Sequence, residues 1–153
     1  MSKMSKLLTL TLLLLMAFAL GACSSASEEA DDGKLRVAVI MPSSVTDLAF
    51  SQSIYDAQIK IQEERGGDEN FEFVFSENMF QVDDAAAAIR DFASQGYDIV
   101  IAHGSQYGTS VQEIAPDFPE TVFAHGTTNR TFVDEGITNV YAYEAASNEG
   151  GYV

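Results

Sequence analysis

Short apolar strands that alternate with helical segments are the feature that most constrains how this chain can fold. The apolar runs are rich in Val, Ile and Phe, and the segments between them repeat apolar side chains every three to four residues. Strands are predicted at 35–40, 71–75, 98–102, 121–124 and 138–141, and helices at 47–64, 81–94 and 105–115. Such units join parallel strands through right-handed crossovers. The sequence therefore predicts an α/β fold, a parallel sheet flanked by helices.

The first predicted helix carries a clear apolar pattern and a clear end. One stripe, which we expect to face the sheet, consists of four apolar side chains: Phe50, Ile54, Ala57 and Ile61. Two glycines at 66–67 end this helix because glycine readily adopts the backbone conformation found after a helix. After the last predicted strand, residues 148–153 begin another element.

The N-terminal residues 1–22 resemble a bacterial export signal. Two lysines precede a mostly apolar stretch from Leu7 to Leu20, which is shorter than the ~20 residues of a membrane-spanning helix. The stretch runs into Leu20-Gly21-Ala22-Cys23, which resembles a lipobox, where the cysteine is diacylated, for instance with palmitate, and becomes the mature N-terminus. We therefore predict a lipoprotein signal peptide at 1–22 and lipidation of Cys23. The alternative is a plain signal peptide followed by a free thiol.

The remainder divides into a short tether and one domain, and its charge excludes two classes of partner. Residues 23–33 comprise the lipidated cysteine and an acidic tether without aromatic or β-branched side chains, and residues 34–153 form the α/β domain. All 23 acidic residues follow Cys23, and the net charge of the chain is −15. Because neutralising phosphates requires clustered Lys and Arg, we expect no nucleic-acid partner and no electrostatic docking on anionic lipid.

Ligands of open parallel sheets bind outside the carboxyl ends of the strands, so the loops that follow the predicted strands are the candidate site. These loops contain neither a glycine-rich dinucleotide fingerprint nor a phosphate-binding loop, and we expect no cofactor. They offer neutral hydroxyl and amide groups instead: Ser43, Ser44, Thr46, Ser105, Gln106, Thr109, Thr127, Thr128 and Asn129. The complement of such groups is a polar, hydroxyl-rich small molecule.

Two histidines, His103 and His125, each follow a strand and precede a glycine, and we expect them to face one another. The two histidines have three possible roles: a metal-binding or acid–base pair, contact with the ligand, or structural hydrogen bonding. A metal is the weakest of them, because no cysteine or second ligand pattern accompanies the histidines. Ser105 lacks the G-x-S-x-G context of a hydrolase nucleophile and is predicted to cap the helix that it begins.

Asp47, Ser51 and Tyr55 follow one another at four-residue spacing, so they share one stripe of the first helix. One interpretation directs this stripe toward a ligand. In the other, Asp47 begins the helix, where the helix dipole favours a carboxylate, and Tyr55 packs at the edge of the sheet.

Several stretches together resemble the BMP family, the basic membrane lipoproteins that include the purine nucleoside receptors. The stretches are Asp47-Leu48-Ala49-Phe50-Ser51-Gln52-Ser53-Ile54-Tyr55, Asp91-Phe92-Ala93-Ser94-Gln95-Gly96-Tyr97-Asp98, His103-Gly104-Ser105-Gln106-Tyr107-Gly108, Ile114-Ala115-Pro116-Asp117-Phe118-Pro119 and Glu149-Gly150-Gly151-Tyr152. Members of this family are substrate-binding lipoproteins of ABC importers with the type I periplasmic binding protein fold. They are about twice as long as this chain, so the resemblance implies that residues 34–153 are the N-terminal lobe, without the second lobe.

The resemblance also implies a function and a set of contacts. Asp47 falls on a ligand-binding acid, and Tyr55 falls on the aromatic residue that stacks on a purine. Ser51 stands where the family often has Asn, and Thr109 stands where it has an acid, which removes a charge. The predicted ligand-binding residues are Ser43, Asp47, Tyr55, His103, Ser105, Gln106, Thr109 and Thr127. A lipid-anchored, extracytoplasmic receptor for a nucleoside-like solute would have a membrane permease as partner, and would be neither an enzyme nor a metalloprotein.

Two alternatives come from other functional classes. One is an exported α/β hydrolase that uses His103, Ser105 and an acid such as Asp47. The other is a ligand-sensing lipoprotein that contacts a membrane sensor instead of a permease.

Overall fold

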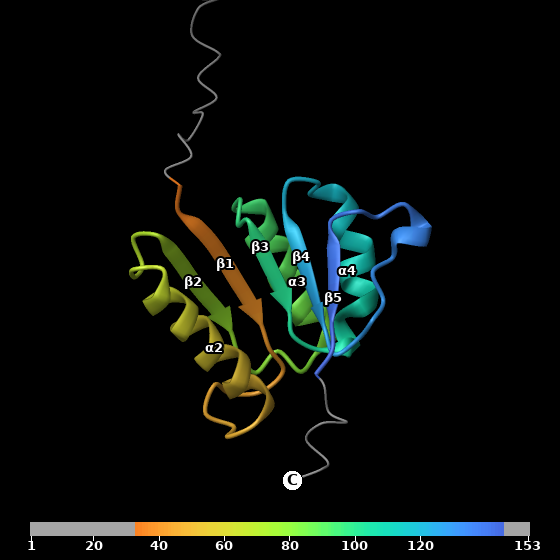
Figure 1. Cartoon of the computed structure of the whole chain (residues 1–153). Helices are drawn as coiled ribbons and strands as arrows, with labels where there is room; N and C mark the ends of the chain where they lie inside the picture. The colour runs from red at the N-terminus through yellow and green to blue at the C-terminus, as the bar shows by residue number, and fades with distance from the viewer. Residues whose placement is uncertain (1–32, 146–153) are drawn as a thin grey trace, which may run out of the picture. The chain divides into compact units, whose positions relative to one another are not determined.

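A five-stranded parallel sheet forms the centre of the computed structural model, which describes residues 33–145 (Figure 1). The strands are β1 (Leu35–Ile40), β2 (Phe71–Ser76), β3 (Ile99–Ala102), β4 (Val122–Gly126) and β5 (Val140–Tyr143), and the helices are α2 (Phe50–Glu64), α3 (Val82–Ser94) and α4 (Gly108–Ile114). Short 3₁₀ turns lie at η1 (Ser105–Tyr107), η2 (Ala115–Asp117) and η3 (Val133–Glu135). The strand order is β2-β1-β3-β4-β5, and every neighbouring pair is parallel, so the predicted fold class is confirmed.

The larger core fills the face of the sheet that α3 and α4 cover. Alternate residues of a strand point to opposite faces, so Ala38 and Ile40 of β1 share this face with Val100 of β3. Helix α3 meets them with side chains spaced four residues apart, Ala85 and Ile89, both fully buried. The carboxylates in the first turn of α3 complement its dipole. This helix therefore packs as its periodicity predicts.

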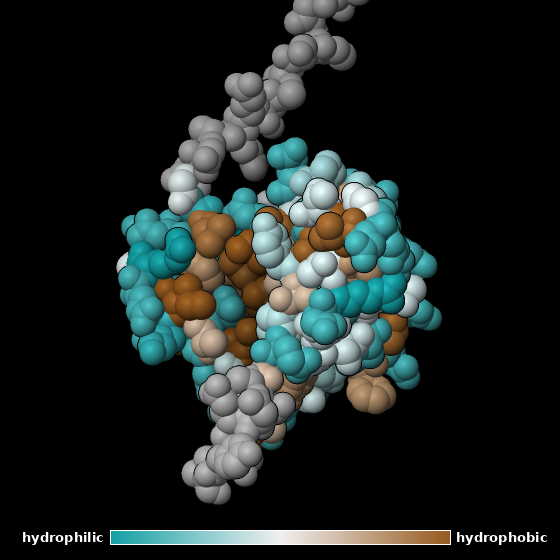
Figure 2. Space-filling view, turned by 45° about the vertical axis from the view of Figure 1, so that its right-hand side comes forward, coloured by the Kyte–Doolittle hydropathy of each residue, from teal (hydrophilic) through white to brown (hydrophobic). Residues whose placement is uncertain are grey.

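The opposite face is covered unevenly. Val37, Val39, Met41, Phe71 and Ile101 are buried there beside α2. Farther along the same face, residues such as Ile99, Val122 and Ala124 are half-buried, and Tyr141 of β5 is 64% exposed. In Figure 2, brown apolar side chains lie open in a hollow of the surface between regions of teal polar side chains. Packing on this face is therefore closest near β1 and β2.

Helix α2 differs from its prediction in its start and in its inward face. It begins at Phe50 and not at Asp47. Ile54 of the predicted stripe packs against the core beside β1 and β2, as predicted, whereas Phe50 and Ile61 are each 36% exposed. The buried residues of the helix are the polar Ser51 and Gln58. Hydrogen bonding explains the burial of Ser51, because its hydroxyl accepts a bond from the amide of Ser43 at 3.1 Å. A buried polar group with a partner is tolerated where an unpaired one would be costly.

Two other predicted elements also differ in their bounds. The segment predicted as one helix at 105–115 consists of η1, α4 and η2 in succession. The last strand lies at Val140–Tyr143, two residues later than predicted, because β4 continues to Gly126 and pairs with it there. In that register His125 lies opposite Ala142, and Gly126 lies opposite Tyr143.

The predicted signal peptide at 1–22, the lipidated Cys23, nearly all of the tether at 23–33 and the element predicted at 148–153 lie outside the described residues. Within residues 33–145, no helix combines the length and the apolar character needed to cross a membrane.

Candidate functional site

The carboxyl ends of all five strands lie at one edge of the sheet, because every strand runs in the same direction (Figure 1). The loops that follow β1, β2, β3 and β4 therefore meet at this edge, which we call the carboxyl edge. Seven of the eight predicted ligand-binding residues lie at this edge or directly beside it. They are Ser43, Asp47, His103, Ser105, Gln106, Thr109 and Thr127. The eighth, Tyr55, lies farther along α2.

Asp47 is held by the backbone at the start of α2. Its carboxylate accepts hydrogen bonds from the amides of Ala49 at 2.9 Å, Ser51 at 3.0 Å and Gln52 at 3.1 Å. The bond from Ser51 is the largest influence that holds the pKa of Asp47 below its usual value, because these bonds favour the charged carboxylate. Asp47 thus lies before the first residue of α2 and not at it, but its carboxylate binds the amides at the helix start, where the alternative interpretation expects a favourable charge. Its contact with a ligand stays a prediction.

Ser43 joins the loops that follow β1 and β2. Its amide donates to the Ser51 hydroxyl, and its carbonyl accepts a bond from the amide of Asn78 at 3.2 Å. The backbone of Ser43 is therefore fixed, and its side chain is half-buried at the carboxyl edge.

His103 connects three elements through a buried imidazole. Its ring stacks on Phe50 with centroids 4.0 Å apart, and only 5% of the residue is exposed. Nε2 lies 3.1 Å from the carbonyl oxygen of Phe50, and Nδ1 lies 2.7 Å from the hydroxyl of Tyr143. A carbonyl can only accept, so Nε2 carries the proton and Nδ1 accepts from the hydroxyl of Tyr143. Burial lowers the pKa of His103, which keeps the ring neutral.

The two histidines do not face one another, contrary to the prediction. His125 pairs with Ala102 across β3 and β4, so it shares the α4 face of the sheet with Ala102. His103 is the next residue after Ala102 and points to the other face, where it stacks on Phe50. The alternation of side chains along a strand is what separates the two rings.

His125 is buried beside Phe132, with 2% of the residue exposed and the two rings nearly parallel. Among the described residues, neither ring nitrogen reaches a partner at hydrogen-bonding geometry. Burial lowers the pKa of His125, and the backbone groups of Ser105 and Arg130 act in the opposite direction. Gly108 leaves space for this ring, because a Cβ there would lie 3.0 Å from Cε1 of His125.

Ser105 does not cap a helix through its side chain, which corrects the prediction. The residue before η1 is Gly104, and Ser105 is itself the first residue of the turn. Its amide donates to the hydroxyl of Thr127 at 2.9 Å, so Thr127 supplies the oxygen that a capping serine would have supplied. This bond ties the loop after β4 to the loop after β3. Thr127 itself adopts a left-handed backbone conformation with φ of 57°.

Gln106 and Thr109, like Ser105, are exposed residues of the predicted set. The Gln106 amide folds over Gly104, where a Cβ would lie 2.5 Å from Oε1 of Gln106. Any larger residue at position 104 would displace this amide. Thr109 lies exposed in the first turn of α4.

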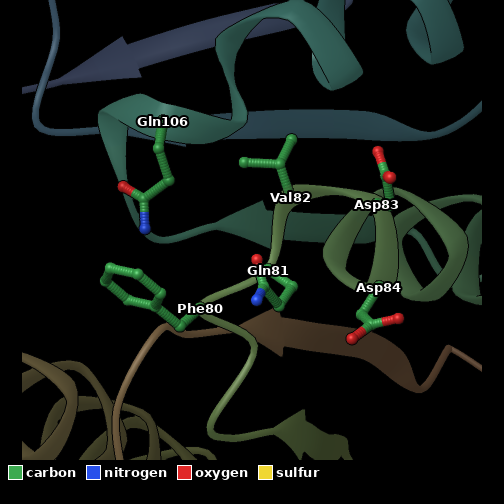
Figure 3. A pocket seen from close by; sticks show the side chains of 6 residues that line it. All are labelled: Phe80, Gln81, Val82, Asp83, Asp84 and Gln106. Atoms are coloured by element: carbon green, nitrogen blue, oxygen red, sulfur yellow. The ribbon is translucent and has the colours of Figure 1, made fainter.

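A hollow of about 790 Å³ lies beside Gln106, between η1 and the start of α3 (Figure 3). The side chain of Gln106 points toward the ring of Phe80 across this hollow. The lining consists of Phe80, Gln81, Val82, Asp83, Asp84 and Gln106. Phe80 was missed in the sequence because it stands alone in a loop, without the periodicity that marks buried aromatics.

Tyr55 lies in an aromatic cluster on the edge strand β2. Its ring meets Phe75 edge-on at 5.1 Å and Phe73 at 5.8 Å between centroids. This is the packing that the alternative interpretation of Tyr55 predicted, and the ligand-stacking role stays a prediction.

The side chains do not assemble the arrangement that the hydrolase alternative requires. Both nitrogens of His103 are directed to Phe50 and Tyr143, and the contacts described for Ser105 are made by its amide. In the described part of the chain, no group of three or more His, Cys, Asp or Glu side chains could hold a metal ion.

Comparison with known proteins identifies the family. Residues 34–153 match the model of the Bmp family, described as PnrA-like ABC transporter substrate-binding proteins. The Transcriptional activator protein med of Bacillus subtilis (strain 168) is 26% identical over 121 residues, which are 78% of this chain and 36% of that protein.

Two solved structures share the fold. An ABC transporter solute-binding protein from Conexibacter woesei DSM 14684 superposes with a TM-score of 0.61 at 22% identity and covers 72% of this chain and 35% of its own. A solute-binding protein from Aeropyrum pernix K1 superposes with a TM-score of 0.60 at 20% identity, and the match covers 72% of this chain and 28% of that protein. The chain thus spans about a third of the length of these relatives. Because the family model matches the whole predicted α/β domain, residues 34–153, the chain belongs to the Bmp family of PnrA-like ABC transporter substrate-binding proteins.

Proposed function

We propose that this chain is part of a lipid-anchored, extracytoplasmic solute receptor of an ABC importer, which binds a nucleoside or a similar polar small molecule at the carboxyl edge. The match to the substrate-binding family over residues 34–153 is the observation that carries this proposal. The family accounts for a small-molecule ligand and a membrane permease as partners.

The chemistry of the carboxyl edge supports a polar, uncharged ligand. Gln106, Thr109 and Asn129 present exposed amide and hydroxyl side chains there. The side-chain oxygens of Asp47 and Thr127 already accept backbone hydrogen bonds, which fixes the loops without using the exposed groups. A ligand would therefore be recognised mainly by neutral hydrogen-bonding groups on loops of fixed conformation.

A titration of the ¹⁵N-labelled protein with a nucleoside, a sugar and an amino acid, followed by amide chemical shifts, tests this proposal. We expect a nucleoside to move amide signals of Phe50, Gln106 and Thr128, and the sugar and the amino acid to move them less. Chemical shifts also report weak binding, which matters because one sheet edge buries only part of a ligand. No shifts with any of the three compounds would refute a solute-binding role.

The lipid anchor rests on the lipobox at Leu20-Gly21-Ala22-Cys23. We expect the protein to fractionate with membranes, and Cys23→Ala to release it or leave it unprocessed. Mass spectrometry of the mature N-terminus would show a diacylated cysteine. An unmodified cysteine in membrane-associated protein would contradict this part of the proposal.

A sensing role is the second candidate, and one observation favours it. The similar Bacillus subtilis protein is named a transcriptional activator, so a relative of this chain takes part in regulation. Growth on the bound solute as sole source, compared with expression of responsive genes after deletion, would separate import from sensing.

A further inference from the structure

We propose that Phe80 and Gln106 form the subsite for the flat base of the ligand, with Phe80 stacking on the ring and Gln106 bonding its edge. This inference rests on the proposed function and assigns the contacts within it. It selects nucleosides and free bases over nucleotides.

Phe80 is an apolar side chain held in the open by a fixed backbone. It is 75% exposed, so its ring contributes little to the core. The residue before it, Met79, donates its amide to the carbonyl of Met41 at 3.0 Å and accepts the hydroxyl of Tyr107 at 2.8 Å. Tyr107 is fully buried, and burial raises the pKa of its hydroxyl to about 12, so it remains a donor. The loop is therefore anchored immediately beside the exposed ring, both to the residue that follows β1 and to η1.

Gln106 stands across the hollow from Phe80 and supplies the polar half of the subsite (Figure 3). Its amide offers a donor and an acceptor side by side, which matches the paired acceptor and donor on the edge of a purine. The close approach to Gly104 orients this amide. At about 790 Å³, the hollow is within the range of small-molecule sites, which is roughly 300–1,000 Å³.

The charges around the hollow determine which ligands are excluded. Asp83 and Asp84 line it from the first turn of α3. Their carboxylates would repel a phosphate, and the net charge of −15 adds to the repulsion. The hydrogen-bonding ligand that fits is therefore an uncharged or amine-bearing ring without phosphate.

Phe80 fits the stacking role better than Tyr55 does. The ring of Tyr55 is already in contact with Phe73 and Phe75 on the edge strand. A ligand would have to displace one of these contacts to stack on Tyr55, whereas the ring of Phe80 is open.

The test is a titration of the protein with adenosine, AMP and ribose, using the wild type, Phe80→Ala, Phe80→Trp, Gln106→Ala and Tyr55→Ala. Val133→Ala is the matched control, because Val133 is an exposed apolar residue, 58% accessible, outside the hollow. Base stacking on an aromatic ring predicts that Phe80→Ala weakens adenosine binding about 5- to 150-fold. Phe80→Trp should retain binding, and the control should bind as the wild type does. AMP and ribose should bind more weakly than adenosine.

The outcomes separate this inference from the proposed function. If the wild type binds none of the compounds, the proposed function fails and the subsite fails with it. If adenosine binds the wild type and Phe80→Ala equally, the inference is overturned while the solute-binding role stands. Tighter binding of AMP than of adenosine would also overturn it. Because Phe80 is exposed, the melting temperature of Phe80→Ala should match that of the wild type, so a loss of affinity would report on the site and not on folding.

Discussion

The hydrogen bond between Tyr143 and His103 should stabilise the fold measurably, and Tyr143→Phe is the perturbation that isolates it. The substitution removes one oxygen and keeps the ring that lies parallel to the imidazole at 6.1 Å. The hydroxyl donates to Nδ1 at 2.7 Å, and the Phe50 carbonyl holds the proton on Nε2. Nδ1 of His103 would therefore become a buried acceptor without a donor, in a residue that is 5% exposed.

Leaving a buried acceptor unpaired costs about 1–3 kcal/mol, so we expect Tyr143→Phe to lower the free energy of unfolding by that amount. Urea denaturation would show a lower midpoint with an unchanged slope. The pKa of His103 should also rise, because the lost donor favoured the neutral ring. An NMR titration of the imidazole measures this second effect separately from stability.

Tyr141→Phe is the control, since Tyr141 lies on the same strand with 64% of the residue exposed. It should change the free energy of unfolding by less than about 0.5 kcal/mol. If Tyr143→Phe costs no more than Tyr141→Phe and leaves the pKa of His103 unchanged, the bond is not the link between α2, β3 and β5 that we describe.

Three further predictions follow from the same contacts. Asp47→Ala should lower the free energy of unfolding by about 0.5–2 kcal/mol in urea denaturation, because three amides at the start of α2 lose their acceptor. Tyr55→Ala should lower the free energy of unfolding by about 1–3 kcal/mol, since each of its two aromatic pairs contributes roughly 0.5–1.5 kcal/mol. Tyr55→Phe should lower it little, because the ring remains. Equal melting temperatures for the wild type and both variants would contradict this prediction. The free energy of unfolding should fall as the pH drops below about 6.5. His103 and His125 have lowered pKa values in the folded protein, so the unfolded chain takes up protons at a higher pH than the folded one. A free energy of unfolding that stays constant between about pH 7 and 5 would contradict this prediction.

The sheet and its order of elements could be predicted from the sequence because buried parallel strands are continuous apolar runs. Val37 to Ile40 is such a run, and together with Leu35 and Arg36 it forms β1 as predicted. The inward face of α2 could not be predicted from apolar spacing, because Ser51 and Gln58 are buried there while Phe50 and Ile61 are partly exposed. Ser51 can lie on an inner face because its hydroxyl accepts the amide of Ser43, a partner that lies outside the helix.

The candidate site was predictable in its location but not in its contacts. Parallel strands place the loops that contain His103 and Thr127 at one edge, and this follows from topology alone. The bond from the Ser105 amide to Thr127 depends on the conformation of two loops distant in sequence. Phe80 left no signal, since an isolated loop aromatic has the same pattern whether it is buried or open.

The interior position of β1, between β2 and β3, has a consequence for synthesis on the ribosome. β1 is the first strand of the sheet to emerge, yet Leu35 pairs with Phe71 and Val37 pairs with Ile99. At about 5–20 residues per second, the chain from Val37 to Ile99 takes about 3–12 s to translate. Until Ile99 has been made, the edge of β1 that pairs with β3 has no partner strand, even if β2 is already in place. A holdase chaperone that covers Leu35–Ile40 during this interval would protect that open edge.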